Sequence, residues 1–186
     1  MRTKIHISGG FGVLMAVLLY LDTENLLPYA LLSCAFHEFG HLCAIWLLGG
    51  EIQEFRLSLV GAEIKPHRVR MFSYAEEFMI AIAGPVASIA CALCSSLFVG
   101  SELMTGMNLC VGVFNLIPAS PLDGGRILKV FISTKTTPFE AEKVCALLSK
   151  LFGLALIPFG CYLLRYGNFT LILSAVWLLS GCEKRK

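Results

Sequence analysis

The sequence predicts an all-α polytopic membrane protein with about six transmembrane helices and a small β-hairpin or sheet at the cytoplasmic membrane face. Three observations predict this class. Of the 186 residues, 56% are hydrophobic and 15% are charged, with a mean hydropathy of +0.75, whereas a soluble domain is typically about 45–50% apolar and about 25% charged. The apolar residues are gathered into six stretches, and one polar connection alternates between apolar and polar residues.

The six apolar stretches are candidate membrane spans separated by short polar loops. They cover residues 5–21, 26–49, 72–100, 104–132, 145–164 and 168–182. A transmembrane helix needs about 20 residues, a length that the second to fifth stretches reach. The first stretch is marginal, and the sixth is short enough to be an interfacial or re-entrant segment.

The positive charges predict how the spans are oriented. Arg2 and Lys4 precede the first stretch, and residues 183–186 add three basic side chains after the last. Lysine and arginine near span ends favour the cytoplasm, so we expect both termini to be cytoplasmic and the number of spans to be even. The connections 50–71 and 132–143 then also lie inside.

The connection at residues 51–66 differs from the other loops. Phe55, Leu57 and Leu59 alternate with polar or smaller residues up to Gly61. This period of two around a glycine indicates two short strands, whose edge could hold an extended peptide as an added strand. An amphipathic surface loop fits the same pattern equally well.

A metal-binding motif lies inside the second apolar stretch. His37, Glu38 and His41 form the pattern H-E-x-x-H. Two histidines four residues apart stand on one face of a helix and can share a metal ion, with the glutamate beside them as a base. Ionisable groups are costly in an apolar span, so they indicate a functional site.

Asp123 is the candidate third ligand, because a catalytic zinc commonly has three protein ligands and an open position for water. It is the only other acid inside the apolar stretches and away from their ends. In the predicted topology the second and fourth stretches run in the same direction, so Asp123 lies at a depth similar to that of His37 and His41.

Pro118, Pro121 and two glycines interrupt the fourth stretch around Asp123. Irregular backbone at membrane depth is tolerated only where protein or a water-filled cavity satisfies its polar groups. Asn115, about two helical turns before Asp123, is a candidate hydrogen-bond donor to an oxyanion. These features are what a hydrolase inside a membrane requires.

The motif at 37–41 and the run N-x-x-P-x-x-P-L-D-G-G-R at 115–126 together resemble the site-2 protease family of intramembrane zinc metalloproteases. Ala83-Gly84-Pro85 matches a small-residue motif of that family, and the run at 115–126 is most similar to the bacterial stage IV sporulation protein FB branch. The resemblance covers the core spans, residues 26–132. It implies one Zn²⁺ per chain held by His37, His41 and Asp123. It also implies that Glu38 is the catalytic base and that Asn115 positions the substrate or the oxyanion.

The resemblance further implies a membrane-embedded or membrane-associated protein substrate, cleaved near the cytoplasmic face, such as a membrane-tethered transcription (sigma) factor precursor. The expected location is a bacterial plasma membrane. Residues 1–186 are expected to form a single protease domain without a CBS or PDZ domain. Regulation is then expected from a regulatory membrane protein or from substrate supply.

Two other functions are weighed against proteolysis. A non-catalytic zinc-binding membrane protein or metal transporter predicts further acids or histidines along the spans, and the span interiors are nearly free of charge apart from Glu38 and Asp123. A degenerate protease scaffold predicts a damaged motif, and the motif is intact. Binding to nucleic acid is not expected, because the basic residues are scattered near the ends of apolar stretches.

Overall fold

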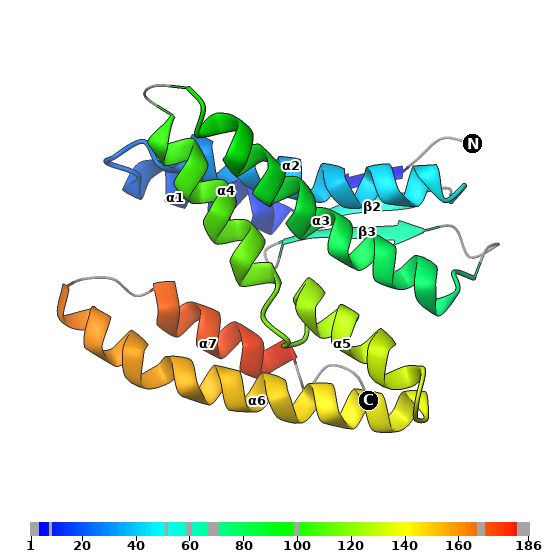
Figure 1. Cartoon of the computed structure of the whole chain (residues 1–186). Coiled ribbons are helices and arrows are strands. Elements are labelled where there is room, and N and C mark those ends of the chain that lie inside the picture. The colour runs from blue at the N-terminus through cyan, green and yellow to red at the C-terminus, as the bar shows by residue number, and fades with distance from the viewer. Residues whose placement is uncertain are drawn as a thin grey trace. The chain divides into compact units, whose positions relative to one another are not determined.

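The computed structural model describes the chain except for residues 1–3, 8, 51, 59–60, 67–70, 99–100, 167–169 and 182–186. The chain divides into two compact units, Met1–Val113 and Phe114–Lys186. Figure 1 shows the elements of both units, and each unit is described by itself.

The first unit combines helices with a small sheet. Its elements in chain order are β1 (Lys4–Ile7), α1 (Gly9–Leu21), α2 (Leu27–Leu47), β2 (Ile52–Ser58), β3 (Gly61–Pro66), α3 (Tyr74–Ser95) and nearly all of α4 (Glu102–Asn115). The Asp22 carboxylate accepts hydrogen bonds from the backbone N–H groups of Leu26 and Leu27, at 2.8 and 2.9 Å, where α2 begins. Ser73 and Glu76 form a capping box at the start of α3, which satisfies backbone donors that the helix itself leaves open.

Small residues let the helices of this unit approach one another closely. A side chain at Gly40 of α2 would place its Cβ 2.6 Å from the Cβ of Ala87 on α3, and one at Gly112 of α4 would come within 3.1 Å of the Ser88 Cβ. Such contacts allow helix backbones to pack tightly where apolar solvent gives no driving force. They hold the motif-bearing face of α2 against α3.

The three strands form one sheet in the order β1-β2-β3. Strands β2 and β3 are antiparallel and lie in the connection where alternation indicated two short strands, while β1 pairs with β2 in parallel. The sequence did not predict β1, because residues 5–7 were assigned to the first span. That boundary is wrong: the strand ends at Ile7, and α1 has only 13 residues.

The second unit contains α5 (Asp123–Ser133), α6 (Pro138–Leu163), a 3₁₀ turn (Leu164–Tyr166) and α7 (Thr170–Gly181). Helices α6 and α7 run side by side; in Figure 1 α6 is yellow to orange and α7 is red. Leu178 of α7 is fully buried and packs with Ala119 and Leu122 of the segment before α5. The core of this unit therefore supports the irregular segment around residues 116–122.

Among the described residues, three helices are long and apolar enough to cross a membrane: α2, α3 and α6. The chain is a helical membrane protein, but these helices do not reach the six spans predicted. Helices α1, α4 and α7 have 13, 14 and 12 residues, so each extends only about 18–21 Å at 1.5 Å per residue. The predicted span 104–132 is two helices, because Pro118 and Pro121 lack the N–H that a continuous helix needs.

Candidate active site

The two motif histidines converge on one point from the same face of α2. The Nε2 atoms of His37 and His41 lie 3.2 Å apart, and both side chains are buried, with 4% and 6% of their surface exposed. Two nitrogens bound to a tetrahedral zinc at about 2.0–2.1 Å would be separated by about 3.3 Å. The observed pair therefore has the spacing of two zinc ligands.

The outer ring nitrogens are held by α3. His41 Nδ1 lies 2.7 Å from the carbonyl oxygen of Ile80. Because a carbonyl only accepts, Nδ1 carries the hydrogen, and Nε2 of the neutral ring keeps its lone pair. His37 Nδ1 lies 3.0 Å from the buried Ser88 hydroxyl, which can accept a hydrogen bond from Nδ1–H when His37 Nε2 carries the lone pair. This is the arrangement of metal-binding histidines, whose second nitrogen is fixed by an oxygen.

Gly84 of α3 keeps the space beside the two histidines open. A Cβ at this position would lie 2.8 Å from His37 Nε2 and even closer to His41 Nε2. Any side chain would therefore compete with a metal ion for the lone pairs. The sequence indicated Gly84 only as part of a small-residue motif and did not indicate Ser88. Their spacing of four residues, equal to that of the histidines, is the signal that could have placed them at the site.

Glu38 follows His37 on α2, and its side chain is half-buried. In the same unit the close approach at Gly40 brings α2 against α3, so that the face carrying His37, Gly40 and His41 is buried. The motif is thus a preorganised pair of nitrogen ligands with a carboxylate one residue away.

Asp123 is the first residue of α5, and 7% of its surface is exposed. The segment before it is fixed by hydrogen bonds. The N–H of Leu122 donates to the Ala119 carbonyl at 2.8 Å. The Ser149 hydroxyl of α6 accepts from the Ser120 N–H at 2.7 Å and donates to the Cys145 carbonyl at 2.7 Å. These hydrogen bonds fix the backbone that leads into Asp123, although this segment is not helical.

Two glycines after Asp123 make this arrangement possible. A Cβ at Gly124 would lie 2.5 Å from the Ile117 carbonyl oxygen, and one at Gly125 would lie 2.6 Å from the Ala119 carbonyl carbon. These neighbours are backbone atoms that cannot turn aside as a side chain can. The start of α5 can therefore press against the preceding segment only without side chains at 124 and 125.

The predicted site residues are distributed over both units. His37, Glu38 and His41 belong to the unit Met1–Val113, and the structure brings the two histidines together. Asn115, the last residue of α4, and Asp123 belong to the unit Phe114–Lys186. We propose below that the two sets form one site.

The fold and the histidine pair define a helical membrane protein with a metal-ligand geometry inside a span-length helix. Comparison with known families agrees. The Peptidase M50B-like family matches residues 11–120, and Peptidase family M50 matches residues 96–158. The chain belongs to the M50 peptidases, the family of the site-2 proteases.

Individual relatives extend this result. A zinc metalloprotease of Methanocaldococcus jannaschii is 30% identical over 199 residues, covering 97% of this chain and 56% of the relative. Stage IV sporulation protein FB of Bacillus subtilis is 30% identical over 172 residues, covering 87% of this chain and 58% of that protein. The chain thus spans a little over half the length of these relatives. Among solved structures, the site-2 protease from M. jannaschii matches with a TM-score of 0.71 and 28% identity, over 97% of this chain and 89% of that one.

Proposed function

We propose that this chain is an intramembrane zinc metalloprotease, a metalloendopeptidase that hydrolyses peptide bonds in a membrane-embedded or membrane-associated segment near the cytoplasmic face. The observation that carries the proposal is the His37–His41 pair, with Nε2 atoms 3.2 Å apart and Nδ1 atoms held by Ser88 and Ile80. Membership of the M50 peptidases and two relatives named as a zinc metalloprotease and a site-2 protease support it.

His37, His41 and Asp123 would hold one zinc ion per chain. Two imidazoles and one carboxylate are a common ligand set for catalytic zinc, and they leave a position for water. Asp123 is suited to be the third ligand because it is buried and follows a segment that is fixed by Ser149 and by close packing at Gly124 and Gly125. The Asp123 backbone is therefore held in place before a metal ion binds, as preorganised ligand residues are.

Zinc, when bound, supplies a Lewis acid for the scissile carbonyl and makes water nucleophilic near neutral pH. Glu38 would take the proton of the attacking water and return it to the leaving amine, as a general base and then a general acid. The Asn115 side chain would donate a hydrogen bond to the carbonyl oxygen as negative charge develops there. Ser88 and Ile80 would keep both rings oriented throughout.

The proposed substrate is a membrane segment that becomes extended beside the site, and a membrane-tethered sigma factor precursor is one candidate. The similarity to stage IV sporulation protein FB supports this choice. Strands β1 and β3 are the outer strands of the described sheet, and an outer strand can accept an extended peptide by main-chain hydrogen bonds. A regulatory membrane protein is a further proposed partner.

We propose a multi-pass location in a bacterial plasma membrane with both termini in the cytoplasm, the two units acting as one protease domain over residues 1–186. The basic residues at both ends of the sequence support this orientation. It requires the short helices α1, α4 and α7 to contribute to crossing the bilayer together with α2, α3 and α6.

A non-catalytic zinc-binding protein or a metal transporter is the alternative from another class. A transport path needs successive polar or ionisable groups through the spans. Helix α2 carries His37, Glu38 and His41 close together, and the acids of α3 lie in its first turn. One compact cluster with a glutamate beside the histidines favours hydrolysis over transport.

The deciding experiment uses the full chain in proteoliposomes with a panel of single-span reporter proteins. Glu38→Gln is expected to keep one zinc per chain and to lose cleavage by about 1,000-fold or more, because the general base is lost. Glu102→Gln, at an exposed acid in the first turn of α4, is the matched control and should cleave normally. Equal cleavage by parent and Glu38→Gln protein would overturn the mechanism, and zinc transport without cleavage by the parent would favour the alternative.

A further inference from the structure

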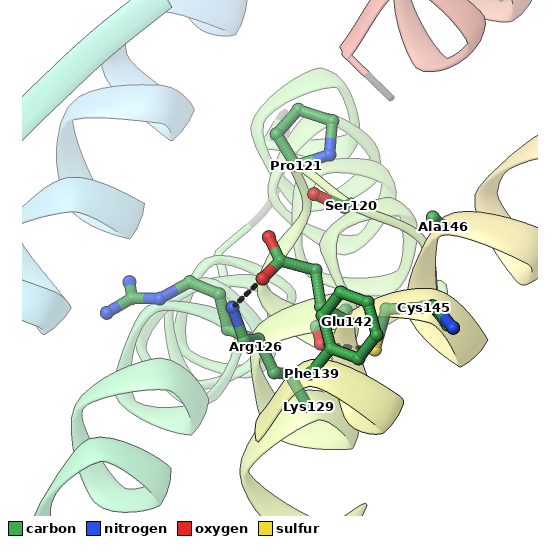
Figure 2. Close-up of a pocket in the computed structure, with 10 residues that line it drawn as sticks. Ser120, Pro121, Arg126, Lys129, Phe139, Glu142, Cys145 and Ala146 are labelled. Atoms are coloured by element: carbon green, nitrogen blue, oxygen red, sulfur yellow. Dashed lines mark hydrogen bonds and ion pairs between the residues drawn. The ribbon is translucent and has the colours of Figure 1, made fainter. Parts of the chain in front are cut away.

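The second unit contains a pocket that the proposed protease chemistry does not use. It has a volume of about 310 Å³ and lies between the segment before α5, α5 itself and the first turns of α6 (Figure 2). It is lined by Ser120, Pro121, Gly125, Arg126, Lys129, Phe139, Glu142, Lys143, Cys145 and Ala146. Its volume is about ten times the roughly 30 Å³ that one water molecule occupies, so it has room for more than a simple ion.

The charges of the lining are predominantly positive. The lining contributes three cations, those of Arg126, Lys129 and Lys143, and one carboxylate, that of Glu142. Arg126 Nη1 also lies 3.9 Å from Oδ1 of Asp123, which is outside the lining. Lys129 Nζ lies 3.5 Å from Glu142 Oε2, the ion pair drawn as a dashed line in Figure 2. Lys143 Nζ lies 4.3 Å from the centre of the Phe139 ring, a cation–π contact. The pocket therefore carries a net positive charge suited to an anion.

The pocket lies at the end of a candidate span. Helix α6 is long and apolar enough to cross a membrane, but its first half, residues 138–150, carries two acids and two lysines, and the run without charged residues begins at Leu151. The lining residues 139–146 lie in this polar first half, close to the start of the apolar run. They are thus at the depth where a span passes from hydrocarbon to headgroups, and basic pockets between helices at this depth bind anionic lipid headgroups.

Apolar side chains continue from the pocket along α6. Phe139 is 67% exposed and Leu147, two turns further on, is 59% exposed. These two side chains can lie along the acyl chains of a lipid while the cations of the pocket bind its headgroup. An inorganic anion would make no use of this apolar surface. The adjoining apolar surface and the pocket volume both favour a lipid over free phosphate.

We propose that this pocket binds the phosphate of an anionic phospholipid headgroup, with Lys129 and Lys143 as its principal cations and α6 beside the acyl chains. The ligand chemistry is a phosphate ester of net negative charge. The site is independent of zinc and of proteolysis, so it stands or falls separately from the proposed function. It would anchor the segment that carries Asp123, because Ser120, Pro121 and Gly125 belong to its lining.

The test uses the purified full chain in a neutral detergent, titrated separately with short-chain phosphatidylglycerol, short-chain phosphatidylcholine and inorganic phosphate, with bound ligand measured by native mass spectrometry. Phosphatidylglycerol is expected to bind saturably at one per chain and about tenfold or more tightly than phosphatidylcholine. Equal binding of the two lipids would overturn the proposal. If equimolar inorganic phosphate displaces phosphatidylglycerol, the ligand of the pocket is free phosphate and the proposal of a lipid is wrong.

Charge variants test the pocket itself. Lys129→Gln combined with Lys143→Gln should weaken phosphatidylglycerol binding about tenfold to thirtyfold, since each basic residue near anionic lipid contributes appreciably. Glu142→Gln should strengthen binding by about threefold, an effect that a folding defect would not produce. Lys150→Gln, at an exposed lysine on the same helix but outside the lining, is the matched control. Unchanged binding in both the double variant and Glu142→Gln would exclude this pocket.

Discussion

The histidine pair and the Asp123 segment reach a defined position by different physical means. His37 and His41 stand on a regular helix, and α3 orients their rings through the Ser88 hydroxyl and the Ile80 carbonyl. Asp123 follows an irregular segment that is held by backbone hydrogen bonds, by Ser149 and by close packing at Gly124. The first arrangement depends mainly on hydrogen bonds to the outer nitrogens of the two rings, and the second mainly on the hydrogen bonds and close packing of the backbone.

This difference predicts how each region responds to mutation. Changes around the histidines should alter zinc affinity with little effect on folding, because α2 and α3 are complete helices without those contacts. Changes around Asp123 should first alter stability, because the segment's backbone is part of the packing of its unit. The following variants test that contrast, using the full chain in detergent.

Gly84→Ala should have the largest effect. The new Cβ would occupy the space beside both Nε2 atoms, so zinc affinity should fall about a hundredfold or more, while helix propensity slightly favours alanine. Zinc affinity is measured by competition with a chelator. Gly106→Ala is the matched control, because nothing lies within 4 Å of a Cβ there. Parent-like zinc affinity in Gly84→Ala would show that the two nitrogens do not face the metal.

Ser88→Ala removes the oxygen beside His37 Nδ1. Loss of such a partner typically lowers metal affinity about tenfold to a hundredfold, and we expect this change with little shift of the melting temperature. Ser95→Ala is the control on the same helix, since Ser95 bonds to Ala92 and Thr105 instead. If the two variants bind zinc equally well, the Ser88 hydroxyl has no role in orienting the ring.

Gly124→Ala tests the other region. The added Cβ would collide with backbone carbonyls of the preceding segment, and forced overpacking of this kind costs about 1–3 kcal/mol. The expected result is a lower midpoint of unfolding, with Gly106→Ala again as the control. A midpoint equal to that of the parent would mean that the segment is looser than the structure indicates.

Ser149→Ala should have the smallest effect. It leaves the Ser120 N–H without its hydroxyl acceptor. An unsatisfied buried donor costs about 1–3 kcal/mol, and the lower end is expected here because Ser120 is only partly buried. The free energy of unfolding should fall, and zinc affinity should change less than in Ser88→Ala. The reverse order of the two zinc affinities would contradict the contrast between the regions.

The same contrast explains which features the sequence could predict. The metal-binding face of α2 follows from spacing alone, since residues four apart on a helix share a face. The roles of Ser88 and Gly84 depend on how closely α3 approaches α2, which no periodicity reports. Gly84 was noted only as part of a small-residue motif, and Ser88 was not predicted.

Span lengths were the weakest prediction. Hydropathy made residues 5–21 and 104–132 continuous, whereas the structure assigns residues 4–7 to a strand paired with β2 and divides the later stretch at the prolines. Apolar composition is shared by buried strands, short helices and spans, so it does not fix where a helix begins or ends. The strands at residues 52–58 and 61–66 lie where alternation indicated two short strands, so the structure decides against the amphipathic surface loop that fitted the same pattern.

The zinc affinity of Asp123→Asn protein tests the central claim most directly, namely that the histidine pair and Asp123 form one metal site. Asparagine keeps the size of the side chain, so the packed segment should fold, but it replaces an anionic ligand by a neutral one. We predict that zinc affinity falls about a hundredfold or more while the unfolding midpoint stays within a few degrees of the parent. Zinc bound at one per chain with undiminished affinity would contradict the claim.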